Sequence, residues 1–194
     1  MHSSMSSHPH IFIVTVLAAL LLVSSGAAAA GSASNDARKT ARELKKQGWK
    51  TLSGKDDIET QLLALYTKQV EDGGGLPRYM VETREAQGRD YASARKQAIS
   101  FARAGIAGGI ESEVTSICEM MIGNRVLAGQ EAESVSSLMM SARTSVQQNI
   151  GSTVVLMEIY RDMPDGGVEV RISLSYDTSA LRGDIAGALG GSSS

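Results

Sequence analysis

The sequence DYASARKQAISFARAGIAGGIESEVTSICEMMIGN, Asp90 to Asn124, carries the longest helical pattern in the chain. Its apolar residues recur at steps of four, with one step of three, which places them on one face of a helix. They are Ala94, Ala98, Ala102, Ile106, Ile110, Val114, Ile117 and Met121. We therefore predict a single long amphipathic helix, whose apolar face must pack against another part of the chain.

Two later segments supply the best partner for that helix. Ser152 to Asp162 and Val168 to Tyr176 both have the composition of strands, and a Pro-Asp-Gly-Gly turn sequence lies between them. In the second segment apolar residues alternate strictly with polar ones, which predicts one buried face and one solvent-exposed face. Val155, Met157 and Ile159 give the first segment a similar apolar face.

A third strand is predicted from about Arg78 to Gln87, where apolar and polar residues also alternate. The fold class is therefore α+β, with a small three-stranded, mostly antiparallel sheet packed by one long helix. Additional N-terminal and C-terminal helices are predicted at Asn35 to Gly48, Ile58 to Val70, Ala132 to Gln148 and Asp177 to Leu189.

The N-terminus has the pattern of a targeting segment. Ile11 to Val23 is almost entirely apolar, and small residues follow it as far as Ala30. This matches a secretory signal peptide cleaved near Ala29 or Ala30. An uncut membrane anchor is the alternative, because Ile11 to Ala30 just reaches the length that spans a bilayer. We expect an exported protein.

The chain is accordingly divided into four parts: a signal peptide at 1–30, an N-terminal helical segment at 31–75, the α+β domain at 76–189 and a flexible tail at 190–194. The 19 Lys and Arg residues are balanced by 21 Asp and Glu residues. This balance lacks the basic excess of nucleic-acid-binding domains, so we expect no nucleic acid partner.

Catalytic chemistry is poorly supported by the residues that remain after cleavage. The three histidines are His2, His8 and His10, so the mature chain contains none. This removes Ser-His-Asp and Cys-His catalysis together with histidine metal sites. Three acidic pairs could act as acid/base pairs or a calcium site, but a helix cap, a solvated helix face and a hairpin turn explain them without function. They are Asp56-Asp57, Glu111 with Glu113, and Asp162 with Asp165. We expect no enzyme activity, no cofactor and no metal.

Two features of the long helix are open to more than one interpretation. Cys118 lies close to the apolar stripe, which favours a small buried hydrophobe over a reactive thiol. Gly105, Gly108 and Gly109 are unfavourable inside a helix by about 1 kcal/mol each relative to alanine. Either the helix approaches the sheet closely at these positions or it kinks near Gly108.

The stretch Asn35 to Lys50 is predicted to form a helix that ends at Gly48, and this stretch is basic on one side and contains the candidate binding residues. They are Arg38, Lys39, Arg42, Lys45, Lys46 and Lys50. A solvated face explains such a pattern without function. The functional interpretation is contact with an acidic surface, either a membrane or a cell-wall polymer.

The order of these elements resembles that of a known family. The segment Asp90 to Ala98, continuing through Ala102-Arg103-Ala104 and Ile110 to Val114, is followed by Val154 to Asp162 and Val168 to Tyr176. This pattern resembles the Lpp-twenty lipoprotein family and the related N-terminal domain of flagellar assembly protein T. The segment Ala37 to Thr51 also resembles exported proteins of Bacteroidetes that have no assigned function.

The resemblance implies a bacterial envelope protein, in the periplasm or associated with the outer membrane, with a structural or interactive role. The chain departs from the lipoproteins because no cysteine follows its apolar N-terminal run. We expect a non-catalytic interaction or scaffold component, whose partner is another envelope protein or a second copy of itself. The alternative is a peripheral membrane-binding or cell-wall-binding protein that uses the basic helix.

Overall fold

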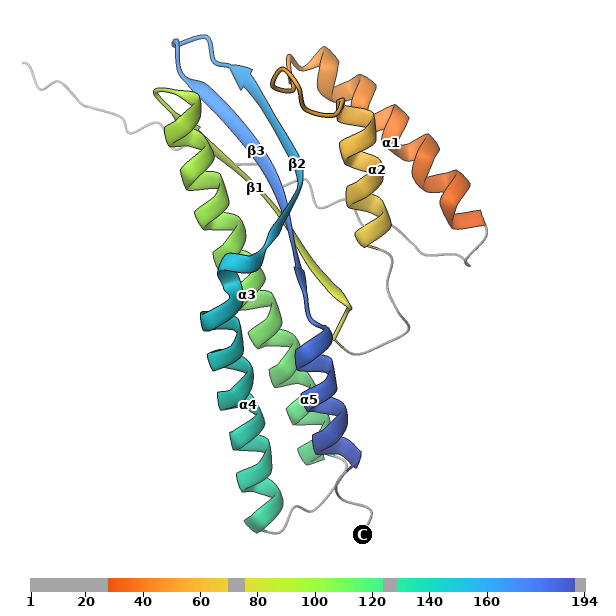
Figure 1. Ribbon diagram of the computed structural model, residues 1–194, viewed down its shortest axis with the longest axis vertical. Helices are drawn as coiled ribbons and strands as arrows, with labels where there is room; N and C mark the ends of the chain where they lie inside the picture. Colours follow the sequence, from red (N-terminus) through yellow and green to blue (C-terminus); the bar gives the residue numbers. More distant parts are fainter. Residues whose placement is uncertain (1–27, 70–75, 124–128, 191–194) are drawn as a thin grey trace, which may run out of the picture.

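The computed structural model describes residues 28–69, 76–123 and 129–190. The elements in chain order are α1 (Ala28–Lys46), α2 (Ile58–Lys68), β1 (Tyr79–Gly88), α3 (Tyr91–Gly123), α4 (Gly129–Asn149), the short 3₁₀ helix η1 (Ile150–Ser152), β2 (Val154–Asp162), β3 (Val168–Asp177) and α5 (Ser179–Gly190). The α+β class predicted from the sequence is confirmed (Figure 1). The predicted signal peptide lies outside the described residues apart from 28–30, which begin α1, and so does 191–194 of the predicted tail.

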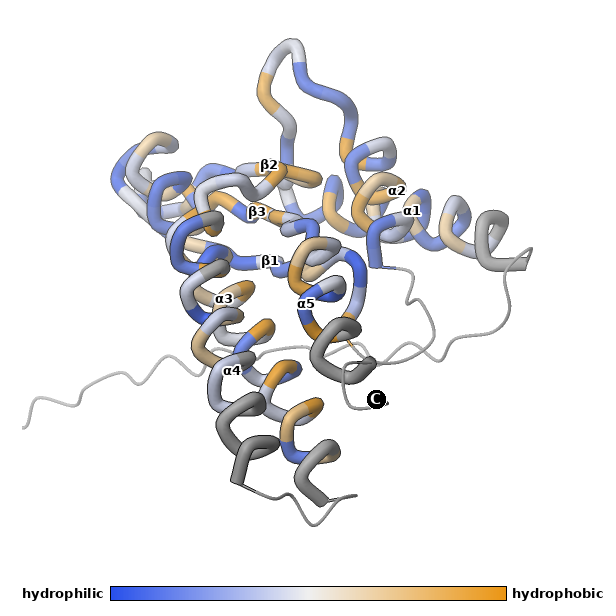
Figure 2. The backbone as a smooth tube through the Cα atoms, turned by 60° about the horizontal axis from the view of Figure 1, so that its bottom comes forward, coloured by the Kyte–Doolittle hydropathy of each residue, from blue (hydrophilic) through white to orange (hydrophobic). Residues whose placement is uncertain are grey.

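The three strands form one antiparallel sheet in the order β1-β3-β2, with β3 in the centre (Figure 2). The predicted hairpin joins β2 to β3. Its turn is closed by the Met163 N–H, which donates to the Gly167 carbonyl at 2.8 Å. Gly166 adopts a φ of +87°, a left-handed conformation that favours glycine.

Helix α3 covers one face of the sheet, as the apolar stripe predicts. Every stripe residue from Ala94 to Ile117 is buried, whereas Met121 lies outside the described side chains. The stripe packs with Val170, Ile172 and Leu174 of β3, and helices α4 and α5 complete this layer. The main core therefore lies between α3 and the sheet (Figure 1).

The opposite face of the sheet is not solvent-exposed, and the prediction of a wet face on β3 is wrong. Glu169, Ser173 and Ser175 are all buried. Helices α1 and α2 lie on this side of the sheet and form a second apolar cluster with Met157 and Ile159 of β2 (Figure 1). Two of the buried polar groups have side-chain partners: Ser173 Oγ lies 2.7 Å from Thr83 Oγ1, and Arg161 Nε donates to Glu169 at 2.6 Å. Hydrogen bonds of this kind offset the cost of removing polar groups from water.

A β-bulge corrects the predicted face of β2. The register with β3 shifts between Val155 and Met157. Val155 is paired with Leu174 on the α3 side, whereas Met157 is paired with Ser173 on the α2 side. One inserted residue reverses the direction of every later side chain, so the apolar residues of β2 serve both layers.

The glycines of α3 allow the helix to lie close to β1. A Cβ atom on Gly105 would come within 2.6 Å of Glu82 Cγ, and one on Gly109 within 3.2 Å of Met80 Cε. The predicted close approach is therefore confirmed at these two positions. A Cβ on Gly108 would meet nothing within 4 Å, so its conformational cost has no packing reason.

The outer edge of β2 is occupied at Glu158 and Tyr160. Helix α1 ends in a Schellman motif at Gly48, whose φ is +85°, and the chain then turns back along β2. Lys50 exchanges two main-chain hydrogen bonds with Tyr160, of 2.7 and 2.9 Å. The side chain of Gln61 accepts from the Glu158 N–H at 2.7 Å. These contacts occupy main-chain groups that an edge strand otherwise leaves open.

None of the helices in the described ranges combines the length and the apolar character needed to cross a bilayer.

Candidate functional site: the basic face of α1

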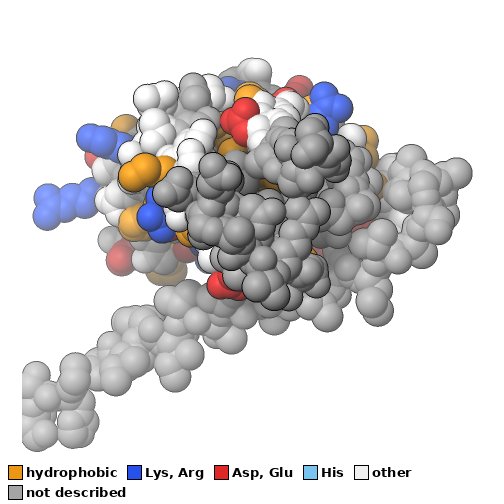
Figure 3. All heavy atoms as spheres, turned by 90° about the horizontal axis from the view of Figure 1, so that it is seen from below, with side chains coloured by type: hydrophobic (Ala, Val, Ile, Leu, Met, Phe, Trp, Pro, Cys, Tyr) orange, Lys and Arg blue, Asp and Glu red, His pale blue; other side chains and the backbone are white. Residues whose placement is uncertain are grey.

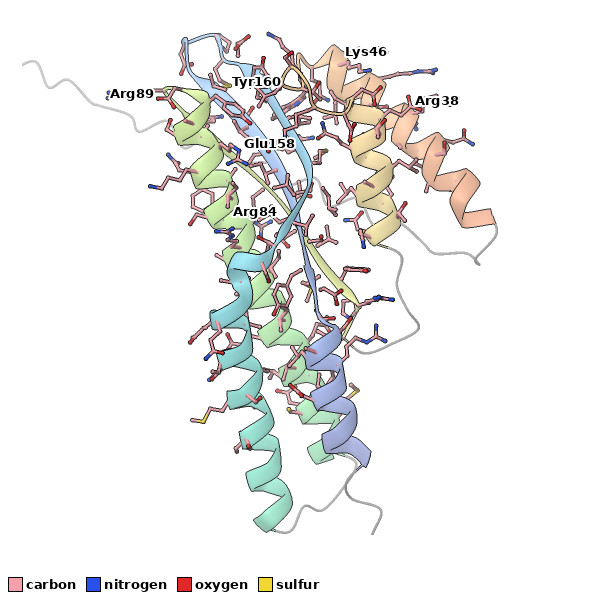
Figure 4. The ribbon with its side chains drawn as sticks, viewed as in Figure 1. Arg38, Lys46, Arg84, Arg89, Glu158 and Tyr160 are labelled. Atoms are coloured by element: carbon pink, nitrogen blue, oxygen red, sulfur yellow. The ribbon has the colours of Figure 1, made fainter. Side chains whose placement is uncertain are left out.

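Five of the six predicted binding residues form one surface, which we call the basic face of α1. It consists of Arg38, Lys39, Arg42, Lys45 and Lys46. All five side chains are exposed. At 3.6 residues per turn they fall within a sector of about 120° on the helix. Figure 4 shows Arg38 and Lys46 on α1, on the side of the molecule away from α3.

The opposite side of α1 is fixed to the protein. Ala37, Ala41 and Leu44 are at most 4% exposed and pack with α2 in the second apolar cluster. Tyr66 of α2 also donates a hydrogen bond to Thr40 at 3.1 Å. The helix therefore presents its cations on a rigid support, and its apolar residues are not free to enter a lipid layer.

Most of these cations are uncompensated. Arg38 pairs with Glu59 of α2 at 3.2 Å. The other four residues of the basic face form no ion pair with any carboxylate of the described residues. Asp57 lies nearby, and hydrogen bonds from Thr60 lower its pKa, with a smaller contribution from the charge of Lys45. Asp57 is itself engaged as the N-cap of α2, so it does not neutralise the face.

The sixth predicted residue, Lys50, is exposed but does not belong to this face. The helix was predicted to end at Gly48, and α1 ends at Lys46 with Gly48 as the terminating residue, so Lys50 lies beyond the helix. Lys50 lies against β2, and its Nζ is 2.6 Å from the Asp162 carboxylate. The hydrogen bond with this carboxylate raises the pKa of Lys50. Its role is therefore contact with the strand edge.

A second group of charged side chains lies inside the protein, between β2 and α3. Glu158 is buried, and its carboxylate accepts hydrogen bonds from Arg95 at 2.6 and 3.3 Å and from the Tyr91 hydroxyl. Tyr91 stacks edge-on against Tyr160, with ring centroids 5.6 Å apart. Burial opposes the charged form of Glu158, but the donors outweigh it and lower the pKa of the carboxyl. Because these groups satisfy one another's hydrogen bonds, the cluster links β2 to α3.

A groove of about 330 Å³ lies between α3 and α4. Its lining is mostly apolar and includes Ile110, Val114 and Val146. The ion pair between Arg143 and Glu111 lies beside it. The face of the molecule seen from below, at the same end, mixes basic, acidic and apolar side chains on its coloured part (Figure 3). Among the described residues, neither the groove nor this end gathers charge of one sign.

The remaining candidate chemistry of the sequence has structural roles. Cys118 is 2% exposed, and burial raises the pKa of its thiol, which disfavours the reactive thiolate. Asp57 caps α2, Glu111 pairs with Arg143, and Asp165 accepts a hydrogen bond from the Gly167 N–H in the hairpin turn. Within the described residues no three acidic, cysteine or histidine side chains cluster as a metal site would require.

No family model, curated protein or solved structure matches this chain. The resemblance to envelope lipoproteins and to flagellar assembly protein T therefore stays a prediction. What the protein does has to be argued from its own surfaces.

Two buried arrangements were missed from the sequence. Trp49 lies under the guanidinium groups of Arg161 and Arg171, whose carbon atoms are 4.7 and 4.6 Å from its ring. Glu158 was overlooked because it follows the bulge, where the alternation of β2 changes face. In the sequence Glu158 lies between Met157 and Ile159, and this alternation was the available sign that its carboxylate points into the other layer.

Proposed function

We propose that this chain is an exported, non-catalytic interaction component of the cell envelope that attaches to an anionic lipid surface through the basic face of α1. The observation that carries the proposal is the gathering of five exposed cations on one side of a rigid helix, four of them without a carboxylate partner among the described residues. The predicted secretory segment at 1–30 supports an envelope location.

The arrangement supports electrostatic attachment at the surface. Each Lys or Arg close to an anionic bilayer contributes about 1 kcal/mol, so five together are sufficient for weak reversible binding. The apolar residues of α1 are buried against α2, which leaves no contribution from their insertion. Binding should therefore fall steeply as salt screens the charges.

The spacing of the charges suits a flat lipid surface. Arg38, Arg42 and Lys46 follow each other at intervals of four residues, so they form a row about 12 Å long along the helix. Lys39 and Lys45 flank this row. Such a row contacts several headgroups at once without requiring any one of them to take a fixed position.

The test is co-sedimentation of the protein with vesicles made with or without anionic phospholipid. We expect binding only to the anionic vesicles, and release by about 0.5 M salt, where the Debye length is only a few ångströms. The double variant Lys45→Glu with Lys46→Glu should bind at least tenfold more weakly, because it reverses two charges worth about 1 kcal/mol each.

A matched control makes the same change in net charge elsewhere. Arg89 and Lys96 are exposed near the start of α3, on the other side of the sheet (Figure 4 labels Arg89). Arg89→Glu with Lys96→Glu should leave binding within about threefold of the unaltered protein. Equal losses in both double variants would contradict the basic face as the site. Binding to purified cell-wall polymer but not to vesicles would overturn lipid attachment and show that this polymer is what the protein binds.

A further inference from the structure

Within the described residues, no strand pairs with the outer edge of β1, where the Thr83 carbonyl accepts a hydrogen bond from the Arg84 side chain of the same strand at 3.2 Å. β1 pairs with β3 on one side only, because it is the first strand in the order β1-β3-β2. Among the described residues, no main-chain group of any other element bonds to its outer side. The opposite edge of the sheet, on β2, is occupied in part by Lys50 and Gln61. An uncovered edge strand is a site at which another strand can pair.

The main-chain groups that point outward can be identified. The Arg78 carbonyl accepts from the Thr178 N–H, so Arg78 faces β3. The direction alternates along a strand, which leaves five residues facing outward. They are Tyr79, Val81, Thr83, Glu85 and Gln87. At the other edge of the sheet, Tyr160 bonds to Lys50, so the main-chain groups of Tyr160 face away from β3. This direction agrees with the same alternation, carried from β2 across β3 to β1.

These five residues are arranged symmetrically about Thr83. If a second β1 lies antiparallel with its Thr83 opposite Thr83, then Val81 faces Glu85 and Tyr79 faces Gln87. Every outward-facing residue then meets another outward-facing residue. The pairing yields about ten N–H···O bonds, two for each of the paired positions.

The side chains complement each other in the same register. Glu82 lies opposite Arg84 of the second copy, and Arg84 opposite Glu82, in the closely spaced pairs of an antiparallel ladder. Within one chain these two side chains already form an ion pair. A shift of two residues in either direction places Glu82 against Glu82 or Arg84 against Arg84 at the centre. Charge therefore selects the register centred on Thr83.

We propose that the open edge of β1 binds a second copy of this chain in that register. The two three-stranded sheets join into one continuous sheet around a two-fold axis at Thr83. The interface is isologous, since each β1 provides the same residues to the other. This goes beyond attachment to an anionic surface and does not depend on it.

Helix α3 provides a second contact in this arrangement. It packs on both β1 and β3, so it lies over the boundary between them. The α3 helices of the two copies are then separated by roughly two strand spacings, about 10 Å, which is a usual distance for packed helices. Phe101 is 51% exposed on α3.

The position of Phe101 fits a contact at the axis. Arg95 and Arg103 of α3 reach β2 and its preceding turn, and by helical geometry Phe101 projects away from both, toward the β1 edge. Gly105 lies beside Glu82 and Gly88 lies beside Ala94, so Phe101 is at about the level of Arg84, one residue from Thr83. Pairing of two copies covers this exposed ring.

Charge reversal tests the register directly by sedimentation of the full chain between about 1 and 200 µM. We expect the unaltered protein to form dimers. Glu82→Arg alone and Arg84→Glu alone should each be monomeric, because like charges then face each other across the axis. An equal mixture of the two variants should restore a dimer, since the two arginines of one variant then face the two glutamates of the other.

Two further variants separate assembly from folding. Thr83→Pro removes an N–H that faces outward, and it also removes the hydroxyl that bonds to Ser173. Thr83→Val loses the same hydroxyl but keeps the N–H, so Thr83→Pro should abolish the dimer whereas Thr83→Val should keep it. Phe101→Ser should weaken the dimer about tenfold, whereas Leu63→Ser, which alters a side chain 39% exposed on α2, should leave it intact. A monomeric unaltered protein at 200 µM would overturn the proposal. So would single charge variants that still dimerise, or a mixture that stays monomeric.

Discussion

Glu158 shows how one residue joins elements that lie far apart in the sequence. Its carboxylate is held by Arg95 and Tyr91 of α3, and its own main-chain N–H is held by Gln61 of α2. The residue therefore connects β2 to both helical layers. Its side chain is 6% exposed, while that of Arg95 is 39% exposed, so water screens only one side of the ion pair.

The pKa of Glu158 predicts a dependence of stability on pH. The carboxyl pKa is lowered in the folded state from its ordinary value of 4.5. The ion pair therefore adds to the free energy of unfolding above about pH 4.5, and this contribution is lost as the pH falls through the lowered pKa. We expect Glu158→Gln to reduce the free energy of unfolding by about 1 to 3 kcal/mol at pH 7.

Below that pH the difference between the two proteins should shrink, because protonated glutamate resembles glutamine. Urea denaturation at pH 7 and at about pH 3 measures both values. A difference that stays constant over this range would contradict the assignment of the acid-dependent stability to Glu158. Glu113→Gln, at an exposed glutamate of α3, is the control, and it should leave the pH dependence unchanged.

Replacing two neighbouring glycines of α3 by alanine should change the stability of the protein in opposite directions. Gly108→Ala should stabilise the protein by about 0.5 to 1 kcal/mol, because alanine favours the helix and its Cβ meets nothing within 4 Å. Gly105→Ala should destabilise it, because the same atom would come within 2.6 Å of Glu82 Cγ. Denaturant titration of both variants measures the two signs. Stabilisation by both would contradict the close approach of α3 to β1.

At the scale of the element, the sequence was informative wherever one periodicity ran without interruption. The stripe of α3 follows a helical repeat from Ala94 to Ile117, so both the helix and its buried face were predictable. The α+β class, the hairpin and the order of elements followed from the same reasoning. None of these needed contacts between residues distant in the sequence.

Elements that depend on distant contacts were predicted less well. The polar residues of β3 look solvent-facing, and only the packing of α1 and α2 makes them buried. The bulge near Leu156 changes the face of β2 without changing its composition. For the candidate site, the end of the helix at Gly48 and the five cations of α1 were predictable from the sequence. Lys50 was wrongly grouped with these cations, because the chain turns back along β2 after the Schellman motif at Gly48.

At the scale of the whole molecule, two apolar clusters share one sheet. One cluster joins α3, α4 and α5 to the sheet, and the other joins α1 and α2 to it. β2 belongs to both, since Glu158 faces α3 while Met157 and Ile159 face α2. Residues that face the two layers alternate along β2. Separating either helical layer from the sheet would therefore expose buried residues of this strand.

This sharing predicts a single cooperative unfolding transition. Trp49 is the only tryptophan and lies in the α1–α2 layer, so its fluorescence reports that layer alone. Far-ultraviolet circular dichroism reports mainly the longer helices of the other layer. We expect the two urea transitions to coincide within error. An earlier transition in fluorescence would show that the α1–α2 layer unfolds independently.

The strand pairing of Lys50 along β2 has a consequence for the number of copies that can assemble. A sheet with two open edges is bivalent and can add copies without limit, as fibres do. This sheet has one edge occupied in part by its own chain and, within the described residues, one edge with no strand partner. If two copies pair through β1, the β2 edge of each is blocked at Glu158 and Tyr160, which disfavours the addition of further copies. The short segment after Gly48 therefore hinders the pairing of another strand with the β2 edge.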